Sequence, residues 1–416
     1  MDSRPPWAIR MTKEREARGW SQAQAVANLR AVYQRAHGKE GGSLESLTRQ
    51  WKEWESGRVR PRHWARYVAA TFGTVADDLF PRDPQPDLHL LEAADMDTAE
   101  LVARLQRTSI DKATIHAVRV TVDRLCSEYR YRPADDLRAE GQDWLRRITR
   151  LLDERLTFAQ HGETLGLAAR LALLVGCTEY DAGQRVKAET TRQFALDLGT
   201  DLDDRDLMGW AHEMAAWFAI TSGDYHQAIA SARHGMDVAG PRGVSVQLAA
   251  QAAKAWARLK NAREAEVALD RGRKILEDLA PTSMNPDDHF VVDPAKWHFY
   301  EMDAYRNLRQ DALAQVYAEE VLRLGTSEFG EERSPMRNAE ARITLGVVAA
   351  RAGDLDEAVS QGMAAFAGSR QSIPSLSMVA QELARELQAP QFADDPRADD
   401  FRAELGRNAA AMSLFT

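Results

Sequence analysis

The chain has 416 residues, of which 44% are hydrophobic and 28% are charged, an ordinary composition for a globular protein. This length exceeds what one small hydrophobic core needs and predicts two or three domains. No apolar stretch approaches the roughly 18 residues of a membrane span, and the first ten residues lack the apolar core of a secretory signal. The two cysteines, Cys126 and Cys177, do not imply a disulfide framework, so we expect a cytoplasmic location and no membrane association.

The net charge of −9 is distributed unevenly along the chain. Residues 1–70 contain 14 Lys and Arg and 7 Asp and Glu, whereas the rest contains 40 basic and 56 acidic residues. A basic head joined to an acidic remainder is typical of a nucleic-acid-binding domain attached to a domain of another kind. A chance fluctuation would give the same asymmetry, so the motifs must decide between the two explanations.

Helical periodicity runs through the whole chain, and the alternating β-branched segments typical of strands are almost absent. We therefore predict an all-α fold. Residues 1–82 are expected to form a compact domain of five short helices. Serine caps and terminal glycines place these helices at 7–18, after Ser21, after Ser43, at 62–72 and at 75–80.

The third of these helices carries the residues that we expect to read DNA. Its apolar residues Leu44, Leu47, Trp51 and Trp54 follow spacings of 3, 4 and 3, which turns the opposite face to solvent. Arginine and glutamine match the base edges of guanine and adenine, while arginines beyond the helix can meet phosphates. The start of the second helix can also hold a phosphate. The residues expected to contact DNA are Ser21, Gln22, Thr48, Arg49, Gln50, Lys52, Arg58, Arg60 and Arg62.

Three segments of the head resemble the Cro/C1 (xenobiotic response element, XRE) type of helix-turn-helix domain: EREARGWSQAQAV, SLTRQWKEWESGRVRP and FGTVADDLF. In that family, motifs like those at 18–22, 54–57 and 72–80 open the second helix, close the recognition helix and end the domain. The resemblance covers about 75 residues and implies binding to duplex operator DNA. One departure is the longer glycine-rich connection at 37–42, ahead of the third helix.

Proline clusters suggest how the rest of the chain is divided. Pro81, Pro84 and Pro86 lie in an Asp- and Pro-rich strip that is expected to be a linker. Residues 83–160 are predicted to contain this linker and a connecting helical layer, which resembles the middle of actinobacterial regulators with the same head. Residues 161–390 are predicted to form a repeat array, and residues 391–416 a C-terminal tail.

Small residues recur along the predicted array at Ala182, Ala228, Ala265, Ala312 and Ala358, which lie 37 to 47 residues apart. This pattern resembles the tetratricopeptide repeat (TPR), a pair of helices that stacks into a superhelix, although the ideal period of that repeat is about 34 residues. The resemblance implies that the first helix of each pair faces a concave surface.

The positions that precede these anchors predict which side chains line the concave surface. They combine aromatic and charged residues, which suits a peptide or a planar ligand. The aromatic residues could instead pack between repeats and leave the charges in solvent, and this alternative stays open. The predicted lining residues are Trp210, Glu213, Trp217, Gln247, Lys254, Arg258, Trp297, Glu301, Tyr305, Glu340 and Arg351.

No motif for enzyme chemistry is complete in this sequence. His212 and Glu213 begin like a zinc-protease helix, but Ala216 stands where that motif needs its second histidine. The acidic run at 201–206 lacks the glycine and the spacing of a calcium loop. We therefore expect no catalytic activity, no metal and no cofactor.

These features together predict a transcriptional regulator that binds DNA as a homodimer and responds to a peptide or small-molecule effector. The resemblance extends to peptide-sensing quorum regulators, which join a similar head to similar repeats. The alternative is a repeat scaffold whose main partner is another protein, with the helix-turn-helix head as an adaptor.

Overall fold

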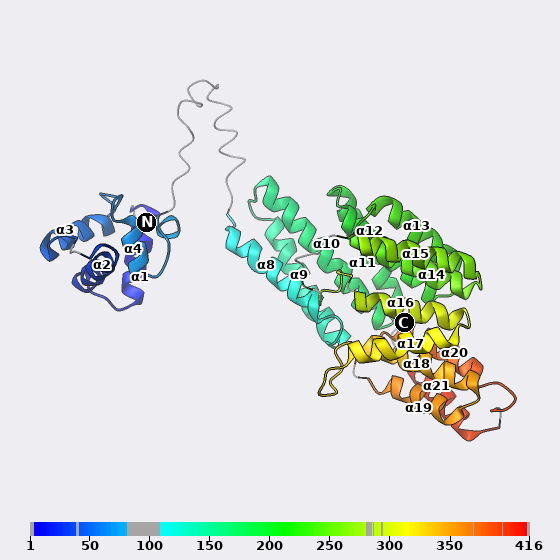
Figure 1. Ribbon diagram of the computed structural model, residues 1–416. Helices are drawn as coiled ribbons and strands as arrows, with labels where there is room; N and C mark the ends of the chain where they lie inside the picture. The colour runs from blue at the N-terminus through cyan, green and yellow to red at the C-terminus, as the bar shows by residue number, and fades with distance from the viewer. Residues whose placement is uncertain are drawn as a thin grey trace. The chain divides into compact units, whose positions relative to one another are not determined.

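The computed structural model describes residues 4–38, 41–80, 109–279, 285, 287–292, 294–368, 370–392 and 394–413. Within these ranges the regular elements are helices, apart from one isolated bridge between Thr326 and Glu332, so the all-α prediction is confirmed. The chain divides into two compact units, Met1–Ala103 and Arg104–Thr416 (Figure 1). The predicted linker strip at 81–86 lies outside the described residues. None of the described helices is both long and apolar enough to cross a membrane.

The first unit, here called the head, contains five described helices close to those expected. Ser21 and Ser43 cap the second and third helices, because each hydroxyl accepts a hydrogen bond from the backbone N–H three residues later. The fourth helix begins three residues later than predicted. The helices are α1 (Pro6–Ala17), α2 (Gln22–His37), α3 (Leu44–Glu55), α4 (Ala65–Thr71) and α5 (Ala76–Leu79).

The apolar face of α3 packs into the core of the head. Leu47, Trp51 and Trp54 are buried there, beside α2 and the end of α4. Leu44 was predicted to share this face but is 46% exposed, because it occupies the first turn, where α3 begins beyond the core. The buried tryptophans fix which side of α3 faces solvent.

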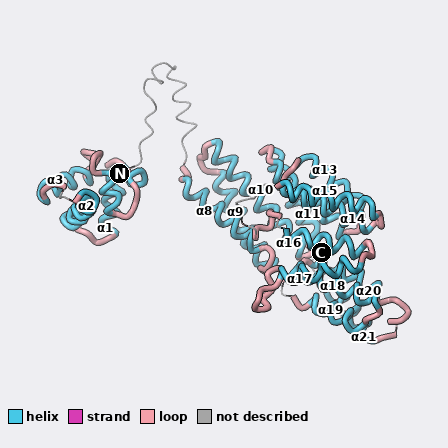
Figure 2. The backbone as a smooth tube through the Cα atoms, in the orientation of Figure 1, coloured by secondary structure: helices cyan, strands magenta, loops and turns pink. Residues whose placement is uncertain are grey.

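The second unit is a continuous stack of helices from α8 onward (Figure 2). The predicted boundary at residue 160 falls inside α10, and both α8 and α9 pack against α10, so the described part of the connecting layer belongs to this unit. The predicted tail also belongs to it, because α21 packs on α19 and α20 and buries Phe401. The helices are α8 (Lys112–Glu128), α9 (Ala134–Leu152), α10 (Phe158–Asp181), α11 (Arg185–Asp201), α12 (Arg205–Thr221), α13 (Tyr225–Ala239), α14 (Gly243–Arg258), α15 (Ala262–Asp278), α16 (Pro294–Asn307), α17 (Asp311–Gly325), α18 (Pro335–Ala352), α19 (Leu355–Phe366), α20 (Ile373–Glu386) and α21 (Pro396–Ser413).

Five consecutive helix pairs, from α10–α11 to α18–α19, share one type of short turn. In each turn one residue adopts a left-handed conformation with φ between 58° and 90°, and the next residue precedes the second helix. Asp224, Asn261 and Asp354 cap that helix by accepting a hydrogen bond from a backbone N–H. The left-handed residues are Gly183, Gly223, Lys260, Arg309 and Gly353. Such tight connections make the two helices of each pair antiparallel neighbours.

The turns correct two of the five predicted repeat anchors. The residue four positions after each cap is a fully buried alanine whose N–H bonds to the carbonyl of the cap residue. Ala228, Ala265 and Ala358 occupy this position as predicted, whereas Ala182 lies in a turn and Ala312 is exposed. Ala188 and Ala314 are the true equivalents. The sequence pattern gave the wrong anchor in these two pairs because another alanine lies near each true position.

The array closes on itself. The first helices of the pairs contact one another in order, and α20 also contacts α10 and α12. Arg370, just before α20, is 1% exposed and forms an ion pair with the buried Asp181 at the end of α10. Trp217 Nε1 of α12 donates a 2.9 Å hydrogen bond to Ser375 Oγ of α20. The inner helices therefore form a ring of contacts and not the open superhelix that the repeat pattern predicts.

Candidate functional site

A buried carboxylate holds α1, α2 and α3 of the head together. Glu55 is 5% exposed and accepts hydrogen bonds from Arg15 Nε at 2.6 Å, Gln22 Nε2 at 2.7 Å and Trp51 Nε1 at 2.9 Å. The bond to Glu55 raises the pKa of Arg15 above its ordinary value, so the arginine stays charged. This hub orients α3 rigidly within the head.

The exposed side of α3 and the segment beyond it carry four of the predicted DNA-contacting cations. Arg49 and Lys52 lie on α3, and Arg58 and Arg62 follow it, all with exposed side chains. Thr48 donates to the Leu44 carbonyl oxygen at 2.7 Å, and Gln50 lies 3.5 Å from Ser46 Oγ, so these two side chains are partly engaged within the helix.

Three further predicted residues have internal roles in the head. Ser21 caps α2, Gln22 donates to Glu55, and Arg60 donates a 2.6 Å hydrogen bond to the Phe80 carbonyl oxygen. Both side chains therefore help to hold the head together, while contact of either residue with DNA stays a prediction. Their pattern in the sequence does not distinguish a structural donor from a DNA-contacting one.

A cavity of about 120 Å³ lies among the inner helices of the second unit. Its walls come from α12, α14, α16 and α18 and from the segment around the start of α20. Five predicted concave-face residues line it: Glu213, Trp217, Gln247, Lys254 and Glu340. Their side chains are largely buried, so this surface is not the solvated face that was the alternative explanation for the charges.

Six other predicted residues lie outside this cavity. Trp297 is 3% exposed and packs on Gly272, and Trp210 packs against Phe290. Both tryptophans are core residues, as the packing alternative proposed. Glu301 bonds to Arg273 and Tyr305 stacks on Tyr317, whereas Arg351 pairs with Asp311 and Glu386. Arg258 belongs to a buried charged cluster described below.

The misplacement in α16 has a simple geometric cause. The predicted residues Trp297, Glu301 and Tyr305 were counted from Ala312, two positions before the true equivalent at Ala314. Two residues correspond to about 200° around a helix, so the count selected the opposite face. The same count from Ala314 selects Phe299, Asp303 and Asn307, of which Phe299 lines the cavity while Asp303 and Asn307 are buried.

Gln251 is a further cavity residue that the sequence interpretation missed. It follows Gln247 by one helical turn on α14, and both side-chain amides donate to the same oxygen of Glu213, at 2.6 Å and 2.9 Å. The i, i+4 spacing of the two glutamines within an alanine-rich stretch of α14 was the available signal.

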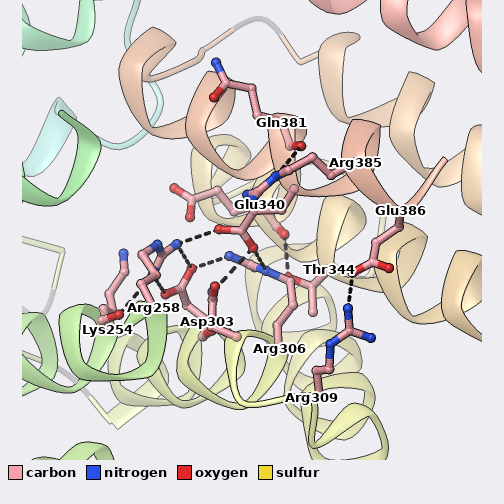
Figure 3. A network of polar contacts seen from close by, with 12 residues as sticks. Lys254, Arg258, Asp303, Arg306, Arg309, Glu340, Thr344, Gln381, Arg385 and Glu386 are labelled. Carbon is pink, nitrogen blue, oxygen red and sulfur yellow. Dashed lines mark hydrogen bonds and ion pairs between the residues drawn. The ribbon is translucent and has the colours of Figure 1, made fainter. Parts of the chain in front are cut away.

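A buried cluster of four charges lies beside the cavity (Figure 3). Arg258 of α14 and Arg306 of α16 surround Asp303, and both arginines also reach Glu382 of α20. Arg258 bonds to Asp303 at 2.5 Å and 2.9 Å, and Arg306 donates to Thr344 Oγ1 at 2.6 Å. Although burial alone would raise it, the two arginines hold the pKa of Asp303 below its ordinary value. The cluster is electrically balanced and fastens three inner helices together.

The structure offers no obvious metal site: among the residues it describes, no three His, Cys, Asp or Glu side chains gather in a suitable group. Cys126 and Cys177 are both buried as free thiols, and burial raises the pKa of each. Such thiols are poor nucleophiles. The chain matches no protein-family model, and no curated protein is significantly similar to it.

Proposed function

We propose that the chain is a sequence-specific DNA-binding transcriptional regulator whose TPR-like second unit binds an effector. The observation that supports this most is the head itself, where a buried hub fixes α3 while Arg49, Lys52, Arg58 and Arg62 stay exposed. Exposed cations on and beyond one rigid helix are what a helix-turn-helix protein needs for base and phosphate contacts.

In this proposal α3 is the recognition helix. Its 12 residues span about 18 Å, and the major groove admits such a helix. Arg49 is assigned to a base edge, and Arg62 to the phosphate backbone beyond the helix. Lys52 and Arg58 add phosphate contacts.

The test begins with selection of binding sites from random duplex DNA by the full-length chain. Arg49→Ala should weaken binding to the selected site by about 1–3 kcal/mol and leave binding to random DNA almost unchanged, because a base contact is lost. Arg62→Ala should weaken both kinds of DNA alike. Arg146→Ala, an exposed arginine on α9, is the matched control. If all three variants bind as the wild type does, or no site is enriched, the proposal is wrong and a protein scaffold becomes the better explanation.

The head is small, and operators for such domains generally contain two half-sites, so the proposal includes a homodimer. Light scattering at micromolar concentration should give twice the chain mass of 46.5 kDa. A chain that stays monomeric both alone and on its selected site would contradict this part of the proposal.

The closed array supports the effector part of the proposal. Its cavity lies among helices that meet where the two ends of the array join, so a ligand that prefers one closure geometry can bias it. A tenfold change in operator affinity needs about 1.4 kcal/mol of difference in ligand binding between the two states. No catalytic role is proposed.

A further inference from the structure

The cavity contains buried acceptor atoms that lack partners. Among the described residues, Gln247 Oε1, Gln251 Oε1 and Glu340 Oε2 are buried and make no hydrogen bond. All three side chains line the cavity and are at most 6% exposed. Buried polar groups in folded proteins are nearly always paired, so this concentration of acceptors indicates a missing donor.

The orientation of the two glutamines is fixed by Glu213. Each amide nitrogen donates to Glu213 Oε1, and an ionised carboxylate can only accept. Rotating either amide would direct its oxygen at that carboxylate. The two amide oxygens are therefore the groups left for an occupant of the cavity, and that occupant must carry N–H or O–H donors.

A cation on the same helix face as the glutamines can bind a negatively charged group of the ligand. Lys254 follows Gln247 by seven residues on α14 and is 5% exposed. Its Nζ lies 5.4 Å and 5.8 Å from the ring centroids of Phe299 and Tyr300. Among the described residues, it is close enough to the carboxylates of Glu340 and Asp303 to interact with their charge, but it forms no direct ion pair with either. A buried ammonium group in this setting can receive an anion.

The size and walls of the cavity limit the occupant further. Its volume of about 120 Å³ is close to the roughly 150 Å³ of a cavity that admits one benzene ring, so a long peptide does not fit inside. Trp217, Phe299 and Tyr300 give it aromatic walls suited to an apolar side chain.

We propose that this cavity binds a single free amino acid with an apolar side chain. Its ammonium group donates to Gln247, Gln251 and Glu340, and its carboxylate pairs with Lys254. A purely anionic ligand leaves the acceptors unpaired, and a simple amine leaves Lys254 without its anion. That this amino acid acts as the effector rests on the proposed function above. The proposal that the cavity binds it does not.

The first experiment measures thermal stabilisation of the full-length chain by each common protein amino acid at millimolar concentration. At least one apolar amino acid should raise the melting temperature. For that amino acid, calorimetry should show at least tenfold weaker binding of both its decarboxylated amine and its deaminated acid. If no amino acid stabilises the chain, or the amine binds as tightly as the amino acid, the inference is overturned.

Two variants with matched controls locate the site. Lys254→Met should make the amine and the amino acid bind equally well, while Lys274→Met on the outer helix α15 should retain the wild-type preference. Gln251→Met should weaken the amino acid and the amine, but not the deaminated acid, with Gln315→Met on α17 as its control. If Lys254→Met does not fold, the comparison of Gln251→Met with Gln315→Met still tests the assignment of the site. An unchanged preference in both site variants overturns the assignment.

Operator binding by the same preparations separates this inference from the proposed function. Site-specific DNA binding without amino-acid binding would overturn only the cavity assignment. Amino-acid binding without DNA binding would overturn only the regulator.

Discussion

The head and the array use buried charge for different purposes. In the head, one carboxylate, Glu55, joins three helices and leaves the basic side chains outside. In the array, the cluster around Asp303 and Arg306 also joins helices, but it lies beside a cavity in which buried acceptor oxygens of Gln247, Gln251 and Glu340 lack a partner. The same chemistry therefore displays an external surface in one unit and supports an internal site in the other.

This difference predicts where each unit is sensitive. The surface of the head depends on one short-range hub, so damage there should stay within the head. The cavity depends on helices that are far apart in the sequence, because Glu382 lies 124 residues from Arg258. Damage to the array cluster should therefore alter the whole second unit.

The largest effect is expected from Arg306→Met. This change leaves Asp303 and Glu382 buried with only Arg258 between them, and breaking such a group costs about 3–5 kcal/mol. Denaturant unfolding of the full-length chain should show the second unit unfolding at a lower denaturant concentration. Arg323→Met, which removes an exposed ion pair on α17, should leave the unfolding midpoint almost unchanged. Equal effects would show that burial does not matter here.

Glu55→Gln should have the next largest effect, confined to the head. It leaves the partly buried Arg15 without its anion and should cost about 2–4 kcal/mol, slightly less than in the array because Arg15 is 13% exposed. DNA binding should weaken while the melting of the second unit is unchanged. Glu16→Gln, at an exposed partner of the same arginine, is the control. A change in the melting of both units would contradict the proposed difference between them.

A pH effect of intermediate size is expected in the array alone. Burial, together with His234 and Arg192, lowers the pKa of His212 to about 4. The unfolded chain binds this proton below a pH of about 6.5, whereas the folded chain does not until about pH 4. The unfolded state thus binds more protons in this window, and stability should decrease as the pH falls from about 6.5 to 4. Unfolding midpoints at several pH values should show a weaker decrease in His212→Gln but not in His161→Gln, the exposed control.

The smallest effect is expected in the turns of the array. Arg309 adopts a left-handed conformation with φ of 58°, which strains an ordinary residue, so Arg309→Gly should stabilise the second unit by about 0.5 kcal/mol. Gly223→Ala tests the reverse change, because its turn has φ of 82° and open space around the glycine, and it should destabilise by a similar amount. Opposite signs in thermal melting support the equivalence of the turns, and equal signs contradict it.

The sequence predicted short-range features well. The caps at Ser21 and Ser43, the buried face of α3 and the exposure of Arg49 all depend on residues within one or two helical turns. The roles of Gln22 and Arg60 were missed because their partners, Glu55 and Phe80, lie 33 and 20 residues away.

The cavity shows the same limit in another form. The correct anchors Ala228 and Ala265 placed two predicted residues of α12 and two of α14 on the cavity, although Trp210 and Arg258 lie outside it. In α16, where the anchor was two residues early, none of the predicted residues lines the cavity. Helical periodicity defines a face of a single helix, but assigning that face to the interior requires the phase between helices. The left-handed residue in that turn is Arg309, so no glycine marked it in the sequence.

The contact between α20 and the start of the array has a consequence for how the second unit unfolds and evolves. In an open stack each repeat touches only its neighbours, so the ends fray and repeats can be gained or lost. Here the ion pair of Arg370 with Asp181 joins residues 189 positions apart. It therefore couples the unfolding of the last helix pair to that of the first. Such a ring loses cooperativity if one pair is inserted or deleted, because its ends no longer meet. The number of pairs is thereby constrained by closure, much as strand number is constrained in a barrel.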